Sequence, residues 1–165
     1  MPTEEIFCVP AKKRINGTIV ASRPLVSKSG TVYDTKFEVK DGQIVDFSAS
    51  KGKDSLQYLM DNNENGRYLG EIAIVPYDTG ISKTGLTYFN SLVDENAGCH
   101  MAIGNAYAKC IEGGMKMSPE ELDAAGLNVC VFHIDFVFGT PETKIVGYKQ
   151  NGEELLIMDK GEFKI

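Results

Sequence analysis

Residues 131–138 read VFHIDFVF, and this stretch says more about the fold than any other part of the chain. Side chains alternate between the two faces of a β-strand. The even-numbered positions are all Phe or Ile, which predicts a face that packs in a core. The odd-numbered positions place His133 and Asp135 on the opposite face, two residues apart. We therefore predict a buried strand within residues 129–138 that carries an imidazole and a carboxylate on the same side.

A histidine and a carboxylate on a buried strand require an explanation. Burying an unpaired carboxylate costs several kcal/mol or forces it to take up a proton. A divalent cation would offset that cost, because neutral imidazole and carboxylate both ligate zinc-like ions. A hydrogen-bonded pair of His133 and Asp135, in a sheet that tolerates polar residues, is the competing interpretation. This stretch alone leaves both interpretations open.

An acidic residue also interrupts the apolar run YLGEIAIVP at residues 68–76. The run predicts a central strand with both faces buried. Glu71 in its middle is either a candidate metal ligand or a residue at a strand end that reaches solvent. Glu4 and Glu5, at the start of the chain, are likewise either candidate ligands or part of a frayed acidic terminus.

The second histidine lies in the segment DENAGCHMAIGNAY, residues 94–107. We expect a helix over residues 97–111, the strongest helical prediction in the chain, with His100 in its first turns. Tyr107 follows seven residues later and would share a face of that helix with His100. Glu95 precedes the predicted helix, where it either complements the helix N-terminus or reaches the same space as His100.

The remaining segments are mostly predicted strands. They cover residues 17–21, 32–39, 44–47, 145–148 and 155–158, with hairpin turns at Asp41-Gly42 and Asn151-Gly152. Helices are predicted over residues 53–60 and, after a capping box at residues 118–121, up to Ala125. Residues 86–93 suit either a strand or irregular structure. This mixture predicts an α+β domain, a mixed β-sheet with two or three helices.

Length and composition limit the classes of function. The chain has 165 residues, of which 42% are hydrophobic and 24% charged, as expected for one globular domain spanning residues 1–165. Lys and Arg total 17 against 23 Asp and Glu, and the longest basic run is Lys12-Lys13-Arg14. We therefore expect no nucleic-acid partner. No apolar run reaches the roughly 18 residues that span a bilayer, so we expect no membrane association either.

The cysteines and the N-terminus predict a cytoplasmic protein. The start MPTEE lacks the apolar segment of a signal peptide. The four cysteines form no CxxC pair and are expected to be reduced thiols. They are Cys8, Cys99, Cys110 and Cys130.

Acids and imidazoles thus occur in four separate segments, each in or beside a predicted buried element. If they converge on one pocket, they would suit two metal ions that share a bridging carboxylate and a bridging water. Pairs of this kind hydrolyse amide bonds or phosphate esters. A dinuclear phosphoesterase is therefore a distant alternative to peptide hydrolysis.

Four stretches of the sequence resemble one known family. They are MPTEEIF at residues 1–7, LGEIAIVPYDTGISKTGLTYFNSLVDENAGCHMAIGNAY at 69–107, GGMKMSPEELDAAGLN at 113–128 and HIDFVFG at 133–139. In this order and spacing they resemble the thermophilic metalloaminopeptidases of the aminopeptidase T, aminopeptidase S and PepS type. The resemblance runs from Met1 to Ile165. It implies that the chain is the metal-binding domain of a larger two-domain α/β aminopeptidase, whose N-terminal domain is expected to be absent here.

The resemblance also implies a mechanism and a set of site residues. The expected activity is release of N-terminal amino acids from peptides, with two divalent ions (zinc, cobalt, manganese or magnesium) activating a water. The implied metal ligands are Glu71, Glu95, His100, His133, Asp135 and one of the pair Glu4 and Glu5. The resemblance favours Glu4 as the ligand and Glu5 as the general base. Tyr107 matches the catalytic tyrosine of the family.

The expected partners follow from the same resemblance. They are peptide substrates with a free N-terminus and either a second copy of the chain or the absent N-terminal domain. The alternative function is a non-catalytic metal-binding or dimerisation fragment of that family.

Overall fold

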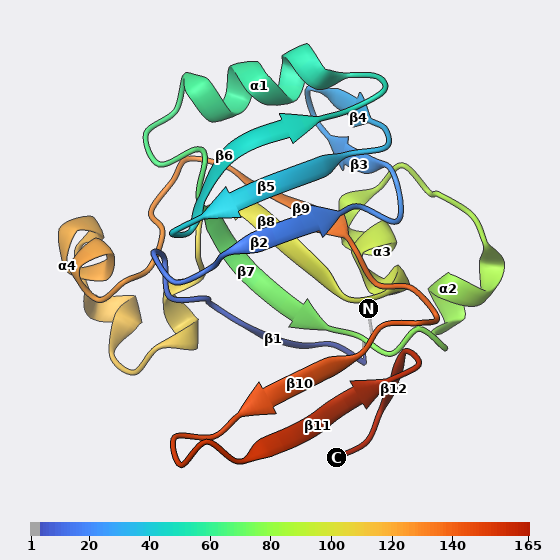
Figure 1. Cartoon of the computed structure of the whole chain (residues 1–165). Helices are drawn as coiled ribbons and strands as arrows, with labels where there is room; N and C mark the ends of the chain where they lie inside the picture. Colours follow the sequence, from blue (N-terminus) through green and yellow to red (C-terminus); the bar gives the residue numbers. More distant parts are fainter. Residues whose placement is uncertain (1–3) are drawn as a thin grey trace.

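Two β-sheets that pack face to face form the centre of the molecule (Figure 1). The structure is a computed structural model and describes residues 4–165. The first sheet has the strand order β1-β7-β8-β9, with β1 at Ile6–Cys8, β7 at Leu69–Ile74, β8 at His100–Gly104 and β9 at His133–Val137. The second has the order β2-β5-β6, with β2 at Gly17–Val20, β5 at Lys36–Lys40 and β6 at Gln43–Ser48. All neighbouring strands in both sheets are antiparallel.

The core lies between these two sheets. Phe37 of β5 packs on Phe136 of β9 with ring centroids 4.8 Å apart. Helix α1, Lys53–Asp61, adds Leu56 and Met60 to the same cluster. The hairpin of β3, Leu25–Ser27, and β4, Gly30–Val32, adds buried apolar residues at its edge. The predicted apolar face of residues 131–138 is confirmed, because Ile134 and Phe136 are members of this core.

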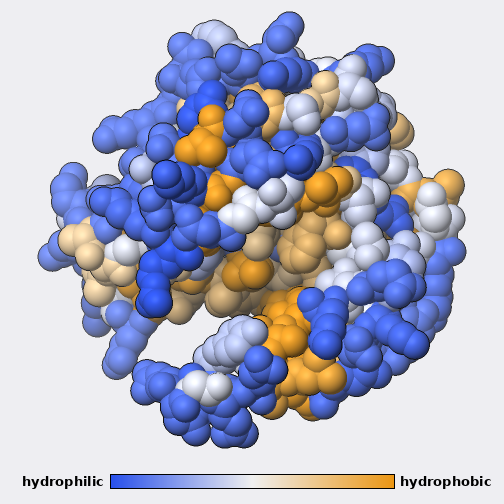
Figure 2. All heavy atoms as spheres, in the orientation of Figure 1, coloured by the Kyte–Doolittle hydropathy of each residue, from blue (hydrophilic) through white to orange (hydrophobic). Residues whose placement is uncertain are grey.

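A smaller C-terminal sheet supports the first one from below (Figure 1). It contains β10, Ile145–Tyr148, β11, Glu154–Asp159, and β12, Glu162–Phe163. Met158 of β11 is fully buried, and its sulfur lies 3.7 Å from the thiol of Cys99, which precedes β8. Figure 2 shows a mostly hydrophilic surface with hydrophobic side chains gathered around the junction of this sheet with the rest of the molecule. The C-terminal sheet therefore buttresses the start of β8.

The helices are short. Besides α1 they are α2 at Gly80–Thr84, α3 at Ser91–Asp94 and α4 at Pro119–Ala124, with 3₁₀ turns η1 at Glu95–Ala97, η2 at Ala108–Cys110 and η3 at Gly114–Lys116. The α+β class is confirmed, although four α-helices occur instead of two or three. The capping box of Ser118 and Glu121 is present at the start of α4. Among the described residues, no helix is long and apolar enough to cross a membrane.

The helix predicted over residues 97–111 is wrong. Residues 100–104 form the inner strand β8, hydrogen-bonded to β7 on one side and β9 on the other. Gly104 ends the strand with φ at 99°, and a Cβ there would lie 2.2 Å from the carbonyl oxygen of Phe132. The two neighbouring strands supply the backbone partners, and this tertiary context outweighs the helical propensity of Met101 and Ala102.

The other predicted elements are largely confirmed, with shifted boundaries. Both hairpins form at Asp41-Gly42 and Asn151-Gly152. The single strand expected over residues 32–39 is divided between β4 and β5, because Asp34 adopts a left-handed conformation with φ at 51°. Residues 86–93 end in the first turn of α3.

Candidate metal centre

The face of the first sheet that points away from the core carries the chemistry. Ala102 in β8 pairs with Glu71 of β7 on one side and with Asp135 of β9 on the other. Residues directly opposite each other in antiparallel strands project to the same face. The alanine has only a methyl group, so the two carboxylates face each other across it. The sheet register therefore brings together acids that are 64 positions apart in the sequence.

Both histidines project from this face. His100 lies two residues before Ala102, and His133 lies two residues before Asp135. His100 Nε2 is 3.6 Å from Glu71 Oε1, and His133 Nε2 is 3.7 Å from Glu71 Oε2. His133 Nε2 is also 3.0 Å from Asp135 Oδ1. Each oxygen of Glu71 thus faces a different imidazole.

Backbone carbonyls orient the two imidazole rings. His133 Nδ1 lies 2.7 Å from the carbonyl oxygen of Asn105, and His100 Nδ1 lies 3.2 Å from that of Gly98. A carbonyl oxygen only accepts, so each Nδ1 carries the hydrogen and donates it. In the neutral rings the lone pair is then on Nε2, which points at the carboxylates. Histidines that ligate metals are commonly held by such a second hydrogen bond.

The surroundings of Glu71 show whether these residues suit a metal ion. The residue is only 4% exposed, and its Oε2 atom is buried without a hydrogen-bond partner in the described structure. A buried carboxylate oxygen without a donor is costly. Two ligand groups share this residue, one with Glu5 and His100 and one with His133 and Asp135. In each group the ligand atoms lie within 4.8 Å of one another. The donor set therefore suits cations on both sides of Glu71.

The two N-terminal glutamates occupy different positions. Glu5 directly precedes the edge strand β1, and its Oε2 lies 3.9 Å from His100 Nε2. Glu4 is exposed and belongs to neither ligand group. Burial raises the pKa of Glu5, and the negative charges of Glu71 and Asp135 add to this, while His100 opposes it. The geometry thus brings Glu5 to the cluster in the place that the resemblance gave to Glu4.

Glu95 reaches the same cavity from a 3₁₀ turn that follows α3. Burial raises its pKa to about 8, aided by the charge of Asp135 and a hydrogen bond with that residue. Its neighbour Asp94 has a structural role, because its carboxylate accepts hydrogen bonds from the backbone N–H groups of Tyr88 and Asn90 at 2.7 and 3.0 Å. Of the two adjacent acids, only Glu95 lines the cavity.

Tyr107 stands beside the cluster, although not on a helix shared with His100. It follows β8, and its ring centroid lies 4.7 Å from that of His133. The side chain is 40% exposed. Burial raises the pKa of its phenol, and the charges of Asp135, Glu71, Glu95 and Glu5 raise it further. Tyr107 therefore remains a protonated hydrogen-bond donor at the edge of the site.

The acidic surroundings favour the protonated form of both imidazoles. Burial alone would lower the pKa of His133, but the hydrogen bond to Asp135, the charge of that residue and the Asn105 carbonyl raise it to about 9. The pKa of His100 is also raised, because Glu71 and Asp135 outweigh the effect of its burial. Burial would raise the pKa of Asp135, but His133 lowers it overall. Without a bound ion, protons on the imidazoles balance part of the negative charge of the cluster.

All of these side chains except the buried His100 line a cavity of about 300 Å³. The sequence prediction missed four further residues of its wall: Phe7, Ser91, Leu92 and Lys109. Leu92 is 70% exposed, although it is apolar. No motif marks these residues, because they meet only through the pairing of β1 with β7 and the position of α3. The one available signal is that Lys109 lies two residues after Tyr107.

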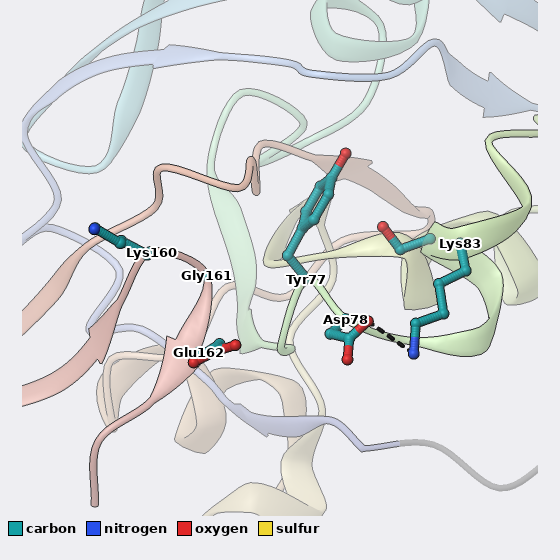
Figure 3. A pocket seen from close by; sticks show the side chains of 7 residues that line it. Tyr77, Asp78, Lys83, Lys160, Gly161 and Glu162 are labelled. Carbon is teal, nitrogen blue, oxygen red and sulfur yellow. Dashed lines mark ion pairs between the residues drawn. The ribbon is translucent and has the colours of Figure 1, made fainter.

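Another surface pocket, of about 250 Å³, lacks the imidazoles that surround Glu71 (Figure 3). It lies between residues 77–83 and residues 160–162. Its Asp78 and Lys83 side chains form an ion pair with each other at 2.8 Å. No histidine lines this pocket, so its polar groups do not repeat the arrangement around Glu71.

Comparisons with known proteins find that this sequence is similar to a family of metalloproteases and to several aminopeptidases. The sequence matches the family described as thermophilic metalloprotease (M29) over residues 1–163. It is 40% identical over 163 residues to aminopeptidase 2 of Geobacillus stearothermophilus and 42% identical over 165 residues to aminopeptidase PepS of Streptococcus thermophilus. These alignments cover 99% and 100% of the chain, but 40% of each relative.

A solved structure shows the same fold. Wild-type AmpT from Thermus thermophilus superposes with a TM-score of 0.90 at 37% sequence identity. The match covers 99% of this chain and 40% of that one. The chain thus spans about 40% of the length of the relatives that it matches.

Proposed function

Because this chain belongs to the thermophilic metalloprotease family M29, we propose that residues 1–165 form the metal-binding catalytic domain of an aminopeptidase. The family resemblance drawn from the sequence is thereby confirmed. One observation carries the proposal: the buried carboxylate of Glu71 lies between the two imidazoles, 3.6 Å from one and 3.7 Å from the other. Two ligand groups that share one acid are what a pair of divalent ions requires.

The proposed ligands divide into two sets around Glu71. Glu5 and His100 would hold one ion, and His133 and Asp135 would hold the other. Glu95, hydrogen-bonded to Asp135, would complete the second set. Imidazole nitrogens and carboxylate oxygens suit zinc or cobalt, and manganese or magnesium would depend more on the carboxylates. When bound, such a pair lowers the pKa of a shared water and polarises the scissile carbonyl.

Two side chains of this domain would handle the proton and the developing charge. Glu5 would ligate its ion through one carboxylate oxygen, and would take the proton of the attacking water on the other oxygen and return it to the leaving amine. Tyr107 would donate its O–H to the oxyanion that forms on the scissile carbonyl. Its raised pKa keeps that proton in place.

The substrate would be a peptide with a free N-terminus, bound in the cytoplasm. Four free cysteines among the described residues support a reducing compartment. The exposed Leu92 on the cavity wall supports a further partner there. That partner would be a second copy of the chain or a segment corresponding to the remainder of the longer relatives.

The second candidate is a metal-binding or dimerisation module without catalysis. The observation that favours it is Leu92, an apolar side chain on the cavity wall that is 70% exposed and could contact another chain. An aminopeptidase assay with leucine p-nitroanilide, run beside metal analysis by mass spectrometry, separates the two. Hydrolysis that a chelator abolishes and zinc or cobalt restores supports the enzyme. About two bound ions per chain with no hydrolysis supports the module.

His133→Ala is the control for both candidates. It removes one ligand and one orienting hydrogen bond from a half-buried position. We expect loss of metal with an unchanged circular dichroism spectrum. Retention of the full metal content by this variant would contradict the proposed site.

A further assay of the unmodified chain tests the third function. Hydrolysis of p-nitrophenyl phosphate without hydrolysis of the anilide would favour a phosphoesterase instead.

A further inference from the structure

A positively charged side chain, that of Lys109, lies on the wall of the acidic cavity. Four carboxylates line the same cavity, from Glu5, Glu71, Glu95 and Asp135. Lys109 is the one lysine or arginine among the described residues that line this cavity. A lysine ammonium at the side of such a cavity, apart from the imidazole among the acids, marks a place for a negatively charged part of a ligand.

Two aromatic rings hold the ammonium group without neutralising it. Lys109 Nζ lies 5.2 Å from the ring centroid of Phe7 and 5.4 Å from that of Tyr107. These two rings contact each other edge to face, with centroids 6.2 Å apart. Within residues 4–165, none of the ion pairs involves Lys109, and its side chain is exposed. The rings thus fix the position of a charge that remains available to a ligand.

The order of side chains along the wall suits a short peptide. His133 contacts the ring of Tyr107, and Tyr107 contacts the ammonium of Lys109. Along the wall, the proposed metal ligand His133 is therefore followed by Tyr107, the proposed oxyanion donor, and then by the ammonium group of Lys109. In a dipeptide, the scissile carbonyl carbon and the terminal carboxylate carbon are three bonds apart, less than about 4 Å. A carbonyl at Tyr107 would leave that carboxylate on the side of Lys109.

We propose that Lys109 binds the terminal carboxylate of dipeptide substrates, so that the site prefers free dipeptides to amidated or longer peptides. This inference rests on the proposed aminopeptidase function. In a tripeptide the carboxylate lies about 3.5 Å further along the extended chain, beyond the position that the two rings define. In an amidated dipeptide the negative charge is absent, and the attraction to the ammonium is lost.

The test compares Leu-Phe with its amide, Leu-Phe-NH₂, in steady-state kinetics of the metal-loaded chain. Lys109→Met keeps an apolar side chain against the rings but removes the charge. We expect it to raise KM for Leu-Phe roughly tenfold, with kcat and the amide kinetics little changed, as for loss of one charged hydrogen bond. Lys109→Arg should restore KM to within about threefold, because the charge is kept. Lys40→Met, on the second sheet, is the matched control and should behave as the unmodified chain.

A binding measurement keeps the inference testable if the chain does not turn over. If so, calorimetry with Leu-Phe and Leu-Phe-NH₂ themselves needs no catalysis, and both ligands keep the carbonyl that places the carboxylate. Tighter binding of the acid by roughly tenfold, lost in Lys109→Met, supports the carboxylate site. Equal binding of acid and amide, or no binding of either, overturns it. Hydrolysis of neither Leu-Phe nor Leu-Phe-NH₂ would contradict the aminopeptidase proposal itself, whatever the calorimetry shows.

Discussion

Glu71 Oε1 lies 3.6 Å from His100 Nε2, and its Oε2 lies 3.7 Å from His133 Nε2. These are the two histidines of the chain. The sheet creates this relationship, because β7 carries the acid, β8 one histidine and β9 the other. A carboxylate so placed can serve two cations at once, one with each of its oxygens.

Glu71→Gln tests the shared acid. Glutamine has nearly the same shape but carries no charge, so the fold should persist while both ions lose a ligand. We expect metal affinity to fall at least about 100-fold, since even outer-shell partners of metal ligands contribute 10–100-fold. Metal titration with a chelating indicator measures this. A variant that binds two ions as tightly as the unmodified chain would contradict the account.

Glu5→Gln and Glu4→Gln form a matched pair of adjacent substitutions. Glu5 lies within 3.9 Å of His100, whereas Glu4 is exposed. We expect Glu5→Gln to reduce both metal affinity and turnover, and Glu4→Gln to change neither. Metal analysis and the anilide assay on both variants provide the readout. Loss of metal in Glu4→Gln, with loss of turnover but not of metal in Glu5→Gln, would restore the assignment that the family resemblance favoured.

Tyr107→Phe removes one hydroxyl at the edge of the cavity. Loss of one oxyanion donor typically lowers kcat by about 10²–10³-fold. We expect that loss with metal content unchanged, because the phenol is not among the proposed ligands. Steady-state kinetics beside metal analysis would show it. An unchanged kcat would remove Tyr107 from the mechanism.

The stability of the chain without metal should fall as pH rises. The pKa of Glu95 is raised to about 8 and that of His133 to about 9, against ordinary values of about 4.3 and about 6.5. At a pH between the ordinary and the raised pKa of either residue, that residue holds a proton in the folded chain and has lost it in the unfolded chain. The free energy of unfolding therefore falls with increasing pH, from about pH 4.3 to about pH 9.

Thermal denaturation in the presence of a chelator, from pH 5.5 to 9, measures this effect. Added zinc should flatten or reverse the decline, because the ligands are deprotonated when they bind a metal. A melting temperature that rises with pH under chelation would show that the proton sites have been assigned wrongly.

The sequence predicted the strand β9, which carries His133 and Asp135, and its two faces. The alternation in residues 131–138 was sufficient, because buried and polar positions follow the two-residue period of a strand. It could not place β8, since His100–Gly104 has helical propensity and becomes a strand only between two partners.

The remaining errors concern contacts that no local pattern encodes. Glu5 reaches His100 because β1 pairs with β7, with Ile6 opposite Ile74. Lys109 lies over Phe7, a residue more than 100 positions earlier. Such meetings depend on the register between distant strands and on loop packing, which the sequence alone does not display.

Anomalous diffraction from crystals loaded with zinc tests the central claim most directly. The account predicts two anomalous peaks per chain, one on each side of the Glu71 carboxylate and about 3.5–4 Å apart. One ion shared by all the ligands would contradict the two-metal arrangement. Peaks elsewhere on the surface, with Glu71 and both histidines bound only to one another, would contradict the metal centre altogether.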